Sequence, residues 1–208
     1  MSETDPDKPP PEFMSALVTE HFVLQGTSSS TVSESGSRVS IYLSALSSGL
    51  VAIGFASGSH RALESLAFTV LPTVFVLGWF TIVRLIETSV ANVVSQRRME
   101  RITRYYASLY AAGAPFFDVG PPAAVGMHGV RYGRWSFLFT MASMVIAVNS
   151  VVGGAAIALV FALAVHATAP IPVVLGVCGG LILLVLSLFY EHRRLTPVVL
   201  THAVPLDE

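Results

Sequence analysis

Four arginines within eight residues form the polar group of this sequence with the clearest capacity to bind another molecule. They are followed directly by Tyr105, and we call them the arginine cluster: Arg97, Arg98, Arg101 and Arg104. Guanidinium groups recognise carboxylates and phosphates, and an aromatic ring adds a surface for stacking. The cluster therefore predicts a face for anionic lipid headgroups or for an acidic protein partner. A nucleotide fits less well, because neither a glycine-rich loop nor acidic metal ligands accompany the arginines.

Asn149 is an amide well inside a long apolar run. A buried amide in lipid needs a hydrogen-bond partner. Two roles are open: Asn149 lines a polar path, or it joins two helices through a hydrogen bond. We favour the joint, because no carboxylate or other strong ligand lies deep in any apolar run. The same observation argues against ion-coupled transport and against intramembrane hydrolysis.

Small residues recur at four-residue spacing in the apolar runs. They form one ridge and three shorter pairs: Ser150, Gly154, Ala158 and Ala162; Gly176 and Gly180; Ser44 and Ser48; Gly54 and Gly58. Such ridges let helix backbones approach closely where lipid supplies no hydrophobic drive. They predict packing inside one chain, which we favour, or self-association into an oligomer, including one built around a pore.

The residue pattern does not favour catalytic or metal chemistry. The six histidines are scattered, and none shares metal-ligand spacing with a Cys, Asp or Glu. The single cysteine, Cys178, stands in an apolar run and is expected to be a small buried side chain. No serine occupies a GxSxG elbow. We therefore expect no metal, no cofactor and no enzymatic activity.

Long apolar segments must position these residues. Apolar residues make up 53% of the 208 residues and charged residues only 12%, against about 25% charged in soluble domains. About 20 apolar residues cross a bilayer as a helix. The sequence predicts an all-α polytopic membrane helical bundle with four transmembrane helices. Their spans are expected at about residues 39–59, 65–86, 136–165 and 170–190.

Residues 1–30 are expected to lie outside the membrane. Their first part is polar and rich in proline, which predicts disorder, and their later part is mildly amphipathic. Residues 26–30 are expected to form a flexible break of small polar residues. Thr31 and Glu34 have the spacing of a capping box, so a helix is expected to start there and to lead into the first membrane hairpin, residues 31–87.

The second span is expected to continue as a basic amphipathic helix that carries the arginine cluster. A loop rich in glycine, proline and aromatic residues follows, and together these make up residues 88–134. Residues 135–194 are expected to form the second membrane hairpin, with Trp135 as an interfacial anchor. Residues 195–208 are expected to be a short, loose tail.

Positive charge predicts the orientation of the bundle. With four spans, eleven of the twelve Lys and Arg residues fall on one side, and only Arg61 falls on the other. The more positive side of a membrane protein is the cytoplasmic one. The acidic start of the chain does not resemble a signal peptide, so both termini are expected in the cytoplasm of a multi-pass cell-membrane protein. The net charge of −1 leaves no nucleic-acid footprint.

The stretch EHFVLQGTSSSTVSESGSRVSIYLSALSSGLVAIGF, followed by a second span and RRMERITRYY, resembles small uncharacterised integral membrane proteins of actinobacteria. The resemblance covers roughly residues 20–110 and implies a small bacterial membrane protein without an assigned activity. A second likeness is architectural. A membrane hairpin that leads into a cytosolic amphipathic helix is similar to membrane effectors of bacterial defence systems, although their usual sensor domain is not recognisable.

Two hypotheses for function follow. The first is a non-enzymatic helical membrane protein that acts by association, with itself or with a partner, through the helix at residues 88–110. The second is an oligomeric pore or membrane-permeabilising effector. In that case the polar residues of the spans face water: Ser44, Ser47, Ser48 and Asn149.

Overall fold

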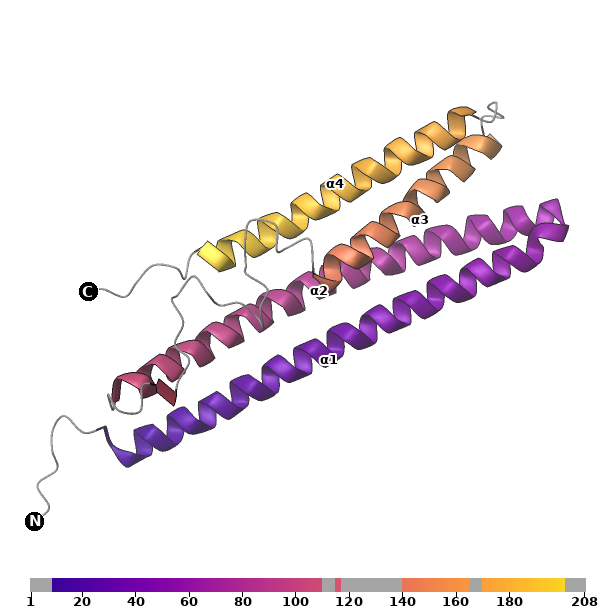
Figure 1. Cartoon of the computed structure of the whole chain (residues 1–208). Coiled ribbons are helices and arrows are strands. Elements are labelled where there is room, and N and C mark those ends of the chain that lie inside the picture. The colour runs from indigo at the N-terminus through magenta and orange to yellow at the C-terminus, as the bar shows by residue number, and fades with distance from the viewer. Residues whose placement is uncertain (1–8, 110–114, 117–139, 165–169, 201–208) are drawn as a thin grey trace, which may run out of the picture.

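The computed structural model describes residues 9–109, 115–116, 140–164 and 170–200. Four long helices make up nearly all of this part (Figure 1): α1 (Pro11–Phe55), α2 (His60–Leu109), α3 (Met141–Ala164) and α4 (Pro170–Leu200). A short 3₁₀ turn, η1 (Ala56–Gly58), joins α1 to α2. These described ranges contain no strand, so the predicted all-α class is confirmed for them.

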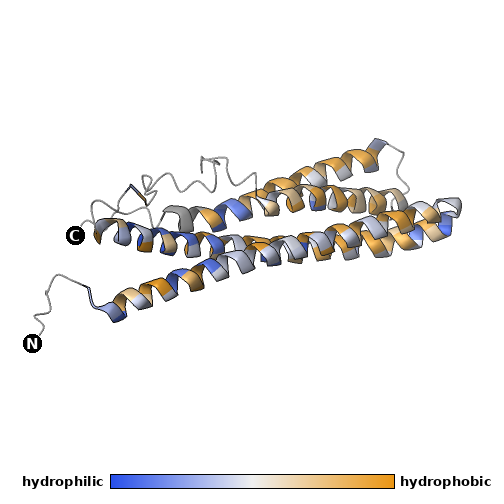
Figure 2. Cartoon of the chain, turned by 60° about the horizontal axis from the view of Figure 1, so that its bottom comes forward, coloured by the Kyte–Doolittle hydropathy of each residue, from blue (hydrophilic) through white to orange (hydrophobic). Residues whose placement is uncertain are grey.

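Each of the four helices is long and apolar enough to cross a bilayer. A hydrocarbon core of about 30 Å needs about 20 helical residues. The 24 residues of α3 and the 31 of α4 are close to that length. The 45 residues of α1 and the 50 of α2 exceed it about twofold, so half of each helix extends past a single crossing. Figure 2 shows this division, with hydrophobic residues near η1 and more hydrophilic ones toward the other end of the pair.

The helices form two antiparallel hairpins that pack through α2. Helix α1 lies along α2 over its whole length, α3 packs against the half of α2 nearer η1, and α4 packs mainly on α3 (Figure 1). The start of α1 and the ends of α2 and α4 lie at the same end of the molecule. The core is built where α1, α2 and α3 meet, around the fully buried side chains of Tyr42, Ile82, Leu85 and Ile146.

The expected break at residues 26–30 is wrong, because α1 passes through it without interruption. Serine and glycine are poor helix formers, but packing against a neighbouring helix outweighs such propensities. Here Ser28 donates a hydrogen bond to Asn92 of α2 (2.5 Å). Thr31 therefore lies inside α1 instead of starting a new helix.

Other expected boundaries also shift. The first two spans, expected at residues 39–59 and 65–86, are separated by η1, and His60 is already the first residue of α2. The continuation of the second span as a helix is confirmed as far as Leu109. The tail expected from residue 195 is helical as far as Leu200, since α4 ends there. Trp135 and the loop expected at residues 111–134 lie outside the described residues, apart from a short 3₁₀ turn at residues 115–116.

Candidate functional site

Asn149 lies at the point where three helices meet. Its Oδ1 accepts a hydrogen bond from the Tyr42 hydroxyl of α1 (3.3 Å). The two side chains are 2% and 0% exposed. On α2 a glycine, Gly78, makes room for this contact, because a Cβ there would overlap the Asn149 amide and the Tyr42 ring. The geometry is that of a joint between helices, and Asn149 does not line a water path within the described chain.

The small residues of α3 and α4 pack against one another inside the chain. A Cβ added to Gly154 would lie 2.7 Å from the Gly176 carbonyl oxygen, and one added to Gly176 would lie 2.7 Å from the Ala158 Cβ. A Cβ on Gly180 would lie 3.0 Å from the Ser150 carbonyl oxygen. Backbone therefore meets backbone along this seam, and any larger side chain would push the two helices apart.

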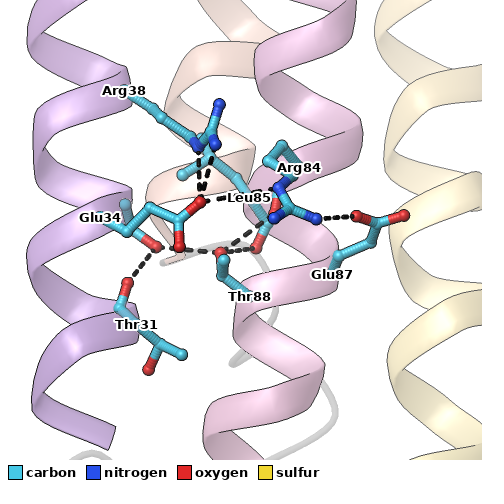
Figure 3. A network of polar contacts seen from close by, with 8 residues as sticks. Thr31, Glu34, Arg38, Arg84, Leu85, Glu87 and Thr88 are labelled. Atoms are coloured by element: carbon cyan, nitrogen blue, oxygen red, sulfur yellow. Dashed lines mark hydrogen bonds and ion pairs between the residues drawn. The ribbon is translucent and has the colours of Figure 1, made fainter. Parts of the chain in front are cut away.

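A network of two arginines and two glutamates joins α1 to α2 where their apolar runs end (Figure 3). Glu34 accepts hydrogen bonds from Arg38 Nη2 (2.7 Å) and Nε (3.0 Å) on its own helix. It also forms an ion pair with Arg84 Nε of α2 (3.6 Å). Arg84 in turn pairs with Glu87 (2.9 Å). The charges of this network sum to zero, so it offers no surplus charge to a ligand.

The hydrogen bond from Arg38 is the main reason that the pKa of Glu34 lies below its usual value of 4.5, and the positive charges of Arg38 and Arg84 lower it further. These side chains are about 40 to 50% exposed. Water therefore screens the pairs, and their role is to hold the register of α1 against α2 more than to stabilise the fold.

Beyond this network α1 and α2 continue as a two-helix stalk, which we define as residues 11–34 and 88–109. Its interface combines small polar contacts with apolar side chains. Leu24 and Ile102 are buried in it. At the far end the rings of Phe13 and Tyr105 meet edge to face, with centroids 5.9 Å apart. The stalk is thus paired to its tip, and Tyr105 already has an aromatic neighbour.

The arginine cluster lies on the stalk, well beyond the charge network. Arg97 and Arg104 follow Arg84 by 13 and 20 residues, which is about 20 and 30 Å along a straight helix. Arg98 and Arg101 are exposed. Arg104 forms an ion pair with Glu100 of the same helix, and Arg97 is half-buried with an interaction of its own. The structure thus separates Arg98 and Arg101 from the two arginines that are already engaged.

Glu191 is the polar residue whose importance the sequence does not reveal. It directly follows the fourth span, expected at about residues 170–190, where a charged side chain ordinarily faces water. Instead it is completely buried. The Thr140 hydroxyl donates to its Oε1 (2.5 Å), whereas its Oε2 is buried without a hydrogen-bond partner. Its place at the end of an apolar run was the available signal, but the burial depends on Thr140, which precedes α3.

Three serines and the cysteine face outward. The expectation that Cys178 is buried is wrong, because it is exposed on the outer surface of α4. Ser44, Ser47 and Ser48 are exposed on α1, whereas Asn149 is sealed inside the bundle. These serines and Asn149 therefore share no surface within one chain.

The described residues contain no group of three His, Cys, Asp or Glu side chains placed to hold a metal ion. No known protein family, curated protein or solved structure matches the chain. The function is therefore argued from the residues of this chain alone.

Proposed function

We propose that this chain is a non-enzymatic, multi-pass protein of the cell membrane that assembles with copies of itself through α1 and carries its stalk into the cytoplasm. Four helices of sufficient length and apolarity support membrane insertion. The distribution of eleven positive residues against one supports the orientation. With this orientation, the stalk and the end of α4 lie on the cytoplasmic side.

The observation that carries the proposal is a row of residues, nearly all of them small, on the outward side of α1 and in the adjoining η1, which we call the small-residue face. Its members are spaced alternately three and four residues apart, and all are exposed: Gly26, Ser30, Ser33, Ser37, Ser40, Ser44, Ser47, Val51, Gly54 and Gly58. This spacing keeps a single side of a helix turned toward a partner helix. A Cβ added to any of its three glycines would meet nothing within 4 Å.

The small-residue face differs from the seam between α3 and α4 in having no partner. The seam glycines are in contact across two helices of the same chain, so self-association does not need them. The face on α1 has the same kind of residue and lies open. In lipid, small side chains permit close approach of backbones, and serine hydroxyls form hydrogen bonds between helices. A second copy of α1 supplies both.

The test is the mass of the purified protein in detergent, measured by light scattering with the detergent subtracted. The wild type is expected to form a defined oligomer. Ser44→Leu combined with Ser47→Leu should convert it to a monomer, because two leucines block close approach along the face. Thr73→Leu, an exposed polar residue at similar depth on α2, is the matched control and should leave the oligomer intact. A monomeric wild type, or an unchanged mass in the double variant, would contradict the proposal.

A pore is the second candidate function, and the exposed serines of α1 favour it. If several copies of α1 surround an axis, Ser40, Ser44 and Ser47 supply hydroxyls toward its centre. Asn149 contributes nothing to such a path, since it is sealed inside the bundle. Release of ions or a small dye from liposomes at a high protein-to-lipid ratio tests this candidate. No release from liposomes that contain the assembled protein would exclude it.

For the arginine cluster, we propose an acidic protein partner in the cytoplasm in preference to lipid. The distance of about 20 to 30 Å from Arg84 exceeds the Debye length of about 8 Å at physiological salt. Charge reversal in Arg98→Glu with Arg101→Glu should therefore leave unchanged the enrichment of anionic lipid around the protein reconstituted in nanodiscs of mixed lipid. A clear loss of this enrichment would restore the lipid interpretation.

A further inference from the structure

Glu191 combines complete burial with incomplete hydrogen bonding. Its side chain has no exposed surface. Oε1 receives one hydrogen bond, from Thr140, and Oε2 receives none. An ionised carboxylate has acceptor sites on both oxygens and needs several donors. A protonated carboxylic acid needs fewer hydrogen-bond donors, because one of its oxygens carries the proton.

Thr140 links this carboxyl group to the start of α3. Its hydroxyl donates to Glu191 and, through the same oxygen, accepts the backbone N–H of Ser143 (3.1 Å). This N–H belongs to the first turn of α3, where unsatisfied donors would otherwise favour a negative charge. The Ser143 N–H is hydrogen-bonded to the Thr140 oxygen and is therefore not available to Glu191. The neutral Thr140 hydroxyl thus lies between the carboxyl group and the start of α3.

No cation on the described helices is placed to neutralise Glu191. Helix α3 carries no charged residue between Met141 and Ala164, and α1 does not touch α4. On α2, Arg84 and Glu87 pair with each other. On α4 itself, Arg193 lies over the ring of Phe189 and Arg194 over that of Tyr190, while His192 has an interaction of its own.

We propose that Glu191 is a proton-binding residue that latches the cytoplasmic ends of α3 and α4. A buried charge without a partner is costly, and such a group takes up a proton instead. In the closed arrangement Glu191 is the neutral acid, bonded to Thr140. Release of the proton to water leaves a carboxylate that must be hydrated, so the end of α4 moves away from Thr140 and α3. The latch does not depend on self-association.

Infrared spectroscopy of the full-length protein in lipid tests the protonation directly. The wild type should show the carbonyl band of a protonated carboxylic acid at about pH 6, where ordinary Glu and Asp side chains are ionised. Glu191→Gln should lack this band, and Glu87→Gln, which removes an exposed carboxylate at the same end of the bundle, should retain it. Thr140→Val should shift its frequency, because the hydrogen bond to Oε1 is lost.

Thermal unfolding in detergent tests the consequence for the fold. A group that holds its proton more tightly when folded stabilises at low pH, and this stabilisation is lost as the pH rises. From about pH 5 to about pH 9 the Tm of the wild type should fall by about 5 °C more than that of Glu191→Gln. If Glu191→Gln does not fold, the infrared band of Thr140→Val tests the proposal instead. A shifted frequency supports the latch, and an unchanged frequency contradicts it. Absence of a protonated-acid band at about pH 6, or equal pH dependence in both proteins, would overturn the latch.

Discussion

The Tyr42 hydroxyl of α1 donates a hydrogen bond to Asn149 of α3 across 3.3 Å, at a level where Gly78 of α2 leaves room for both. The two residues are separated by 107 positions in the sequence. Their contact connects the first hairpin to the second in the middle of the apolar bundle. An amide here has few alternatives, because the apolar side chains packed around it offer no hydrogen-bond partner.

Tyr42→Phe should therefore destabilise the protein by about 1 kcal/mol, a typical cost for one interhelical hydrogen bond in a membrane protein. In a protein of this size that corresponds to a fall in Tm of about 2 to 4 °C. Thermal unfolding in detergent measures it. The control is Tyr190→Phe, because the Tyr190 hydroxyl accepts a hydrogen bond from the exposed Arg194 (3.4 Å) and its loss should matter less. If both variants lower the Tm equally, the hydrogen bond from Tyr42 to Asn149 does not contribute more to stability than an exposed one.

Substitution of glycine by leucine should have different consequences on the two small-residue surfaces. Gly176→Leu should reduce the yield of folded protein, because the added side chain meets the backbone of α3. Gly54→Leu adds the same side chain in open space on α1, and it should alter the oligomeric state without unfolding the chain. Circular dichroism and light scattering on the same samples separate the two effects. If the Gly176→Leu protein folds but changes its oligomeric mass, the seam lies between copies of the chain and not inside one copy.

Glu34→Gln should weaken the connection between α1 and α2 in a pH-dependent manner. Because the hydrogen bond from Arg38 lowers the pKa of Glu34 in the folded protein, its contribution is present above about pH 4.5 and is lost as the pH falls through the lowered value. The wild type and Glu34→Gln should thus differ slightly in Tm at neutral pH and converge in acid. Added salt should reduce the difference, since the pair is partly exposed. A difference in Tm between the two proteins that persists in acid would show that Glu34 contributes through packing and not through its charge.

Cysteine labelling tests the topology. In a Cys178→Ser background, a single cysteine at Ser15 of the stalk should react with a membrane-impermeant maleimide only when the cytoplasmic side is accessible. A cysteine at Ser57, within the turn η1, should react only from the opposite side. A cysteine at Ser48 lies within the apolar run of α1 and should resist the reagent from both sides. Reaction of Ser15 and Ser57 variants from the same side would refute the arrangement with four spans.

The apolar runs made the helices predictable, because about 20 consecutive apolar residues have few alternatives in lipid. The continuation of α2 was predictable from the helical spacing of its apolar residues. The continuity of α1 was not, because Gly26 and its neighbouring serines favour a break locally. Their helical conformation depends on contacts such as Ser28 with Asn92, which lie 64 residues apart.

Spacing alone could not assign the small residues to internal or external surfaces. Gly176 and Gly54 stand in the same kind of four-residue repeat, yet one is enclosed by α3 and the other is open. Tyr42 gave no sign of its role, since a tyrosine in an apolar run is unremarkable without knowledge of what lies opposite. The burial of Glu191 was missed for the same reason, because it depends on Thr140, 51 residues away.

The unbroken course of α1 and α2 makes the stalk a lever arm with its pivot at the ends of the apolar runs. Each stalk helix has about 22 to 24 residues, which gives an arm of about 35 Å. A tilt of the hairpin by about 10° then displaces the tip, at Phe13 and Tyr105, by about 6 Å. A small rotation at the base of the stalk is thereby converted into a displacement of several ångströms at its tip and a smaller one at the arginine cluster.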